Sequence, residues 1–132
     1  MENTLTAIDI GKAIVKKHDN GHLYITIREG QELDVDDIKA LVQAKNQLCG
    51  NEPHTTLLIA GNNSSISSEA RAFASSKEAY KGAIAKSIVT KCLPTRLIGN
   101  FFIRFNNPPA PTKLFACEKE AVQWLNLMRK KA

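Results

Sequence analysis

The chain has few of the residues that usually disclose a function. Aromatic residues make up only 6% of its 132 positions, and the three cysteines form no C-x-x-C pair. Neither G-x-G-x-x-G nor G-x-x-x-x-G-K-[ST] occurs, so the common phosphate-binding loops are missing from the sequence. The longest apolar runs are far shorter than the roughly 20 residues that cross a bilayer. These absences argue against a metal centre, a nucleotide-binding loop and a membrane span.

The cysteines and the charge distribution bear on location and partners. Cys49, Cys92 and Cys117 are odd in number, and the chain shows no secretory signal pattern, which favours a reducing cytoplasm. Lys and Arg exceed Asp and Glu by 18 to 13, but part of this excess lies in residues 129–131. No basic cluster alternates with aromatic residues. We therefore expect a cytoplasmic protein with no nucleic-acid partner and no cofactor.

Composition and hydrophobic patterning predict one α/β domain over residues 1–132. The chain is 43% hydrophobic and 23% charged, as is typical of a soluble domain. The expected strands are Lys12 to Lys17, His22 to Arg28, Thr55 to Ala60, Ala83 to Thr90 and Lys113 to Cys117. The expected helices run from Asp34 to Gly50, from Ser67 to about Tyr80, across Lys91 to Asn107, and from Glu118 to Lys130. Their alternation predicts a mostly parallel sheet of about five strands with about four helices.

The helix expected within Lys91 to Asn107 is apolar almost all the way round, so we expect protein to cover it on more than one side. Leu93, Leu97, Phe101 and Phe105 follow one another at a spacing of four residues and form a ladder on one face. We expect this segment to be the most buried of the chain, packed against the sheet, the terminal helix or a second subunit. The alternative is a small apolar or lipid-like ligand held between this helix and the sheet.

An enzymatic function has the weakest support. His18, His22 and His54 show no spacing that a metal ion or a catalytic triad requires. His54 follows Pro53 just before a strand, where we expect a solvated loop histidine. We therefore expect no catalytic residues and no metal ligands.

The segment from Ala70 to Leu125 carries a resemblance to a known family. It reads ARAFASSKEAYKGAIAKSIVTKCLPTRLIGNFFIRFNNPPAPTKLFACEKEAVQWL, with an R-x-x-x-N-F-F helix, a proline-rich connector and a terminal A-x-x-W-L helix. Together with the preceding β-β-α-β half, it resembles the small bacterial STAS/SpoIIAA-like proteins, relatives of anti-sigma factor antagonists. The resemblance implies a STAS-like fold and a regulatory or binding role in place of a known reaction.

The same resemblance directs attention to the serines after the central strand. In the antagonists, a phosphorylatable serine would stand at the start of the next helix within an Asp-Ser-Ser-Gly motif. Here the sequence from Ser64 to Ala70 is S-S-I-S-S-E-A, which lacks both the preceding aspartate and the following glycine. Ser67 and Ser68 are the phosphorylation candidates, and helix capping by Ser67 is the alternative.

Loops at the carboxyl ends of parallel strands often form the binding sites of α/β proteins, so we expect the segment Asn62 to Glu69 to face a partner. The predicted partner or ligand surface consists of Asn62, Asn63, Ser64, Ser65, Arg71, Arg96 and Phe102. The arginines are expected to pair with carboxylates or backbone carbonyls, or alternatively to receive an anion beside the serine-rich loop. We expect a non-enzymatic protein-binding module of a bacterial signalling circuit, with small-ligand binding as the alternative and a homodimer as a further possibility.

Overall fold

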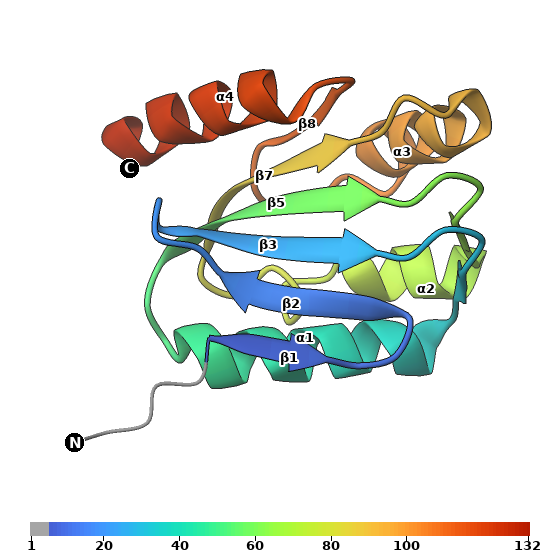
Figure 1. Cartoon of the computed structure of the whole chain (residues 1–132), viewed down its shortest axis with the longest axis horizontal. Helices are drawn as coiled ribbons and strands as arrows, with labels where there is room; N and C mark the ends of the chain where they lie inside the picture. Colours follow the sequence, from blue (N-terminus) through green and yellow to red (C-terminus); the bar gives the residue numbers. More distant parts are fainter. Residues whose placement is uncertain (1–5) are drawn as a thin grey trace.

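In the computed structural model, which describes residues 6–132, a mixed sheet of six strands separates two helical layers (Figure 1). In spatial order the strands are β1 (Ala7–Asp9), β2 (Ala13–Lys17), β3 (His22–Ile27), β5 (His54–Ala60), β7 (Ala83–Val89) and β8 (Thr112–Phe115). The helices are α1 (Val35–Cys49), α2 (Ser68–Ala74), α3 (Leu93–Phe105) and α4 (Glu118–Lys131). The first three strands are antiparallel, and β3, β5, β7 and β8 are parallel. The expected α/β class is confirmed, with one more strand than the five expected.

The additional strand is β1, which pairs antiparallel with β2 at the edge of the sheet. Its three residues are too few to show a hydrophobic period, which is why the sequence did not disclose it. A surface ion pair between Arg28 and Asp9, at 3.1 Å, links this edge to the residue that follows β3.

Two hydrophobic clusters lie on opposite faces of the sheet. The larger one lies beneath α1, α2 and α3, and the smaller one lies beneath α4. The central strand β5 contributes to both, because Leu58 packs against the first cluster and Leu57 belongs to the second. This two-sided burial explains why the run from Thr55 to Ala60 is apolar without alternation.

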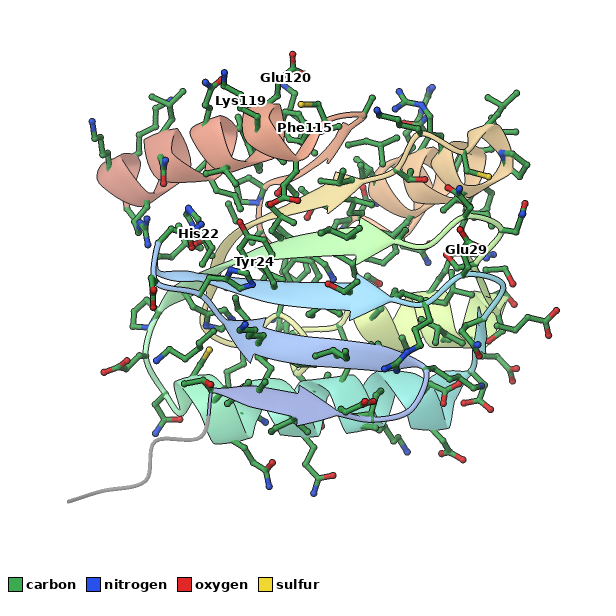
Figure 2. The ribbon with its side chains drawn as sticks, in the orientation of Figure 1. His22, Tyr24, Glu29, Phe115, Lys119 and Glu120 are labelled. Carbon is green, nitrogen blue, oxygen red and sulfur yellow. The ribbon has the colours of Figure 1, made fainter. Side chains whose placement is uncertain are left out.

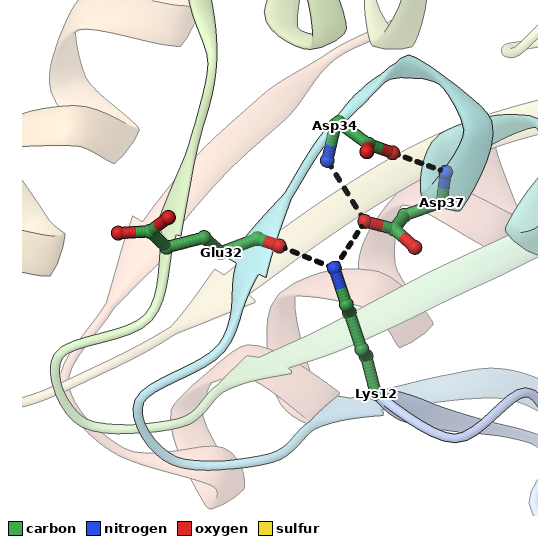
Figure 3. Close-up of polar contacts among 4 residues, drawn as sticks. All are labelled: Lys12, Glu32, Asp34 and Asp37. Carbon is green, nitrogen blue, oxygen red and sulfur yellow. Dashed lines mark hydrogen bonds and ion pairs between the residues drawn. The ribbon is translucent and has the colours of Figure 1, made fainter.

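The start of α1 is fixed by a reciprocal capping box (Figure 3). The Asp34 side chain accepts a hydrogen bond from the Asp37 backbone N–H at 2.9 Å, and the Asp37 carboxylate accepts one from the Asp34 backbone N–H at 2.9 Å. Lys12 donates from its Nζ to Asp37 and to the Glu32 carbonyl, each at 2.8 Å. Lys12, the residue before β2, therefore links β2 to the first turn of α1 and to Glu32, which precedes that helix.

A second, two-stranded parallel sheet forms beside the main one. It pairs β4 (Glu32–Leu33) with β6 (Ser65–Ile66). The segment Asn62 to Glu69, which the sequence analysis places in a loop, therefore contains a short strand. Because each strand has only two residues, their pairing depends on where the flanking chain places them and not on a local pattern.

The second helix is shorter than expected, since α2 ends at Ala74 and not near Tyr80. Ser75 donates a hydrogen bond from its side chain to the Ala72 carbonyl at 2.9 Å, a local bond that competes with continued helix. The turns that follow are held by the buried Lys45 of α1, whose Nζ donates to the carbonyls of Ala79 at 2.8 Å and Lys81 at 3.1 Å. These long-range bonds are invisible in the sequence.

On the face of the sheet that α4 covers, a polar network holds the end of α4, and its central residue is His22 at the start of β3 (Figure 2). The fully buried His22 of β3 hydrogen-bonds to Thr55 of β5 through Nδ1 and to Asn126 of α4 through Nε2, the latter at 2.8 Å. Arg129 donates to the Asn126 side chain at 3.2 Å and to the Asn20 carbonyl at 2.9 Å. The His22 side chain therefore links β3 to β5 and to α4, and Arg129 links α4 to the turn before β3.

We predict that Asp34→Ala lowers the free energy of unfolding by about 1 kcal/mol, because it removes the side chain that caps α1. Urea denaturation measures this change. Asp36→Ala is the control, since it removes an acidic residue from the same first turn without removing a capping bond. If the two substitutions lowered the free energy of unfolding equally, Asp34 would stabilise α1 through its charge near the positive end of the helix dipole, and not through the capping bond.

We also predict that the protein loses stability as the pH falls below about 6.5. Burial lowers the pKa of His22 from its usual 6.5, the bond to Asn126 opposes this shift, and the Arg129 charge adds to it. Burial likewise lowers the pKa of His54 from 6.5. Between the unfolded-state and folded-state pKa values, the histidines are protonated in the unfolded chain but not in the folded chain. The free energy of unfolding therefore decreases as the pH falls, until the folded-state pKa values are reached.

Urea denaturation between about pH 7.5 and about pH 5 tests this prediction. His22→Gln should flatten the pH dependence but not remove it, because His54 remains. His18→Gln is the control, because the His18 ring stacks on Tyr24, with ring centroids 3.6 Å apart, and takes no part in the network around His22. An unchanged pH dependence in His22→Gln would contradict the assignment.

Candidate functional site

The helix α3 presents four large apolar side chains to solvent. Leu93, Leu97, Phe101 and Phe105 are 67%, 61%, 46% and 65% exposed. These four residues are called the α3 stripe below. The expectation that this ladder would be the most buried part of the chain was wrong. The residues of α3 that are buried are Thr95, Gly99 and Phe102.

The orientation of α3 follows from its close approach to β8. A Cβ atom added at Gly99 would lie 2.9 Å from a methyl carbon of Leu114, which is closer than real Cβ atoms come to other atoms. The small residues Thr95 and Gly99 therefore form the face on which the helix can approach the sheet, and Phe102 fills the space next to them. Because this buried face is narrow, the other apolar side of the helix is left uncovered.

Basic side chains surround the α3 stripe. Arg71 of α2 lies over the Phe101 ring, with its guanidinium carbon 4.9 Å from the centroid, and donates to the Ile66 carbonyl at 2.9 Å. Arg96 donates to the Thr90 carbonyl at 3.3 Å. Arg104 is exposed near the end of α3, which contains no acidic residue. The patch is therefore apolar with a positive border.

The predicted loop residues meet the beginning of α3. The Cys92 thiol contacts the Asn63 side-chain oxygen at 3.7 Å, and Thr95 donates to the Ser64 carbonyl at 3.4 Å. Asn62 and Asn63 are exposed, so they extend the accessible surface beyond the α3 stripe. Ser64, however, is only 6% exposed and is not available to a macromolecular partner. Ser65 is half-buried because it pairs within the small sheet.

The phosphorylation candidates occupy the start of α2. Ser67 accepts a hydrogen bond from the Ala70 backbone N–H at 3.1 Å and so caps the helix. Ser68 is exposed in the first turn. Capping accounts for Ser67 by itself, and phosphorylation of either serine stays a prediction.

A mostly apolar cavity of about 140 Å³ lies between the sheet and the helices α1 to α3. Its walls include Ile25 of β3, Leu58 of β5, Leu41 of α1 and Phe102 of α3. Phe102 was predicted to belong to the partner or ligand surface; at 6% exposed it is not open to a protein partner, but it forms part of this cavity wall. The same helix therefore forms part of the cavity with one side and the α3 stripe with the other.

Several polar groups reach this cavity. Lys86 of β7 places its Nζ 5.4 Å from the Tyr80 ring centroid and 5.9 Å from that of Phe102. Burial lowers the pKa of Lys86 to about 8, and the charge of Lys45 adds to this shift. Burial raises the pKa of Tyr80 to about 12, against the hydrogen bond that its hydroxyl makes with Thr112 at 2.8 Å. Tyr80 therefore stays neutral and leaves the cavity with a positive potential.

His54 also belongs to the cavity wall, and the prediction of a solvated loop histidine was wrong. It is 8% exposed and forms the first residue of β5. Its Nδ1 lies 3.1 Å from the Glu52 carbonyl, so Nδ1 carries the proton and Nε2 is an acceptor. Burial lowers the pKa of His54, which keeps the imidazole neutral.

The sequence analysis missed Lys86, Lys45 and Tyr80 as cavity residues. Lys86 interrupts the otherwise apolar strand AIAKSIV, and a lone charged residue in a buried strand is the signal that identifies it.

No group of three or more potential metal ligands comes together within residues 6–132. In the same part of the chain, no helix is long and apolar enough to cross a membrane.

Comparison with solved structures defines the class of fold. The chain resembles an uncharacterized protein of the DUF3478 family with a SpoIIAA-like fold, from Shewanella loihica PV-4. The match covers 95% of this chain and 98% of the other, with a TM-score of 0.58 and 17% sequence identity. The SpoIIAA-like fold that the sequence resemblance implied is therefore confirmed.

Residues 16–129 match the family called Domain of unknown function (DUF7793), and the chain belongs to that family. A protein with unknown function from Arthrobacter sp. FB24 is 24% identical, with 86% of this chain and 98% of the other covered. Its TM-score of 0.30 is too low to support an argument. Among curated proteins, none matches the chain.

The orientation of α3 can be tested with two phenylalanines of the same helix. We predict that Phe102→Ala costs about 3 to 5 kcal/mol of unfolding free energy, because it removes a buried ring from the cavity wall. Phe105→Ala should cost less than about 1 kcal/mol, since this ring is mostly exposed. Chemical denaturation measures both. Comparable losses would contradict the orientation of the helix.

Proposed function

We propose that the protein is a non-enzymatic binding module whose partner is another protein, docked on the α3 stripe. The observation that carries this proposal is the exposure of four large apolar side chains along the whole length of α3. Together they expose on the order of 400 Å² of apolar surface, a size at which patches on monomers are often functional. Side chains at this spacing fit an amphipathic helix laid along the stripe.

Charge favours a partner with acidic residues. Arg71, Arg96 and Arg104 border the stripe, and α3 has no acidic residue to balance them. Pairing with a second copy of this chain would bring two such positive borders together, which costs free energy. An amphipathic helix with acidic flanks would match both the apolar stripe and its positive border. We therefore propose such a helix of another protein as the partner, in preference to a second copy of this chain.

The remaining parts of the proposal concern chemistry and location. The proposal includes a binding role without catalysis, which the spacing of the histidines in the sequence led us to expect. A cytoplasmic location is supported by the three free cysteines, Cys49, Cys92 and Cys117. The exposed Asn62 and Asn63 beside the start of α3 extend the docking surface toward α2, where phosphorylation of Ser68 would add negative charge near it.

We test the proposal with two synthetic amphipathic helical peptides that share one leucine stripe and differ only in their flanks. One carries Glu and the other Lys. Fluorescence anisotropy should show tighter binding of the Glu peptide, and its affinity should fall with added salt. Leu97→Glu should weaken binding at least about tenfold, because it places a charge in the centre of the stripe.

Leu127→Glu is the matched control, since Leu127 is a leucine of α4 that is 57% exposed. This variant should bind the Glu peptide as the native chain does. Equal affinity for the two peptides, or loss of binding in both variants, would contradict the proposal. A dimer that Leu97→Glu dissociates, measured by sedimentation, would assign the stripe to self-association instead.

A further inference from the structure

The cavity behind α3 holds a cation that lacks a counter-ion. Neither of the ion pairs found within residues 6–132 involves Lys86, and no Asp or Glu lies in the cavity wall. The neighbouring Lys45 directs its ammonium to the carbonyls of Ala79 and Lys81. The Lys86 ammonium lies instead near the rings of Tyr80 and Phe102, 5.4 Å and 5.9 Å from their centroids. Ring faces stabilise a cation less completely than a carboxylate does.

A second polar group in the same wall is also unsatisfied. His54 is 8% exposed, and its Nε2 is buried without a hydrogen-bond partner in the described part of the chain. A buried acceptor without a donor is costly, so native structures rarely keep one. His54 and Lys86 lie on adjacent strands and on the same face of the sheet, because Thr56, two residues after His54, pairs with Lys86.

The size and lining of the cavity limit what it can hold. A volume of about 140 Å³ is similar to that of an engineered apolar cavity of about 150 Å³ known to bind benzene. Most of the wall is apolar, with Ile25, Leu41, Leu58 and Ile88 among its residues. Such a space accepts a ring or a short hydrocarbon chain with one polar end.

We propose that this cavity is a binding site for a small, mainly apolar monocarboxylate, with its carboxylate paired to the Lys86 ammonium and its hydrocarbon part enclosed behind α3. This site is separate from the α3 stripe, and its occupant is a metabolite-sized anion and not a protein. Charge complementarity selects an anion, since the wall supplies lysines and no carboxylate. The hydrocarbon part displaces water from apolar walls, which favours binding in proportion to the buried area.

The probes for this site are benzoate and its uncharged counterpart benzyl alcohol. They differ in charge and share a ring of the size that the cavity admits. Titration followed by two-dimensional NMR should show saturable shifts at Ile25, Leu58 and Ile88 with millimolar benzoate. Benzyl alcohol should bind at least about tenfold more weakly, because it offers no charge to Lys86.

Lys86→Met removes the ammonium and keeps an unbranched side chain of similar length. It should weaken benzoate binding at least about tenfold and abolish the preference over benzyl alcohol. Lys113→Met is the matched control, because Lys113 lies on the neighbouring strand with its Nζ 5.5 Å from the Phe115 ring, but is exposed. This control should bind benzoate as the native chain does.

Three outcomes would overturn the proposal. The first is the absence of saturable shifts at the cavity residues with either probe at millimolar concentration. The second is equal binding of benzoate and benzyl alcohol to the native chain, a comparison that holds even if Lys86→Met fails to fold. The third is equal weakening by Lys86→Met and Lys113→Met, which would indicate a general charge effect and not a site.

Discussion

The close contact between Gly99 of α3 and Leu114 of β8 is the constraint on which the rest of the functional region depends. It requires that α3 approach the sheet on its narrow side, where Thr95 and Gly99 are small. With that side inward, Phe102 enters the wall of the cavity and the α3 stripe faces outward. A larger residue at position 99 would meet a methyl group of Leu114, so that either this side chain or the helix would have to shift.

The two faces of α3 offer different chemistry. The outer face is a continuous apolar stripe with a positive border, which suits a helix with acidic flanks. The inner face closes a cavity in which the half-buried Lys86 has no ion-pair partner among residues 6–132 and the buried Nε2 of His54 has no hydrogen-bond partner there. Buried polar groups without partners are costly, and so are large apolar groups left in water. Each proposed occupant removes one cost: the helix covers the apolar stripe, and the carboxylate supplies a counter-ion for Lys86.

Much of the fold was predictable because local signals agreed with the tertiary structure. Asp34 is the cap of α1, Gly50 follows its end, and the apolar run ending at Ala60 is the central strand, all as the pattern indicated. The SpoIIAA-like fold was also inferred correctly from the carboxyl-terminal motif. The short strands β1, β4 and β6 were missed, because two or three residues carry no period and pair only where long-range contacts place them.

The candidate site was less predictable, for a physical reason that α3 illustrates. Both of its sides are apolar, so periodicity identified the larger residues, Leu97 and Phe101, as the packed face. Packing was instead decided by the absence of a side chain at Gly99, which hydrophobic patterns do not record. Lys86 escaped notice for a similar reason, since a single lysine in a strand has no pattern. Its position becomes meaningful only when Tyr80 and Phe102, distant in sequence, lie beside it.

The exposure of the phenylalanines of α3 tests the central claim most directly. The protein labelled with 4-fluorophenylalanine can be studied by fluorine NMR in the presence of a soluble paramagnetic agent, with the resonances assigned by single substitutions. We predict strong broadening for Phe101 and Phe105 and protection for Phe102, with Phe101 and Phe105 becoming protected when the Glu peptide is added. Equal protection of all three in the free protein would contradict this account, because the stripe would then be covered already.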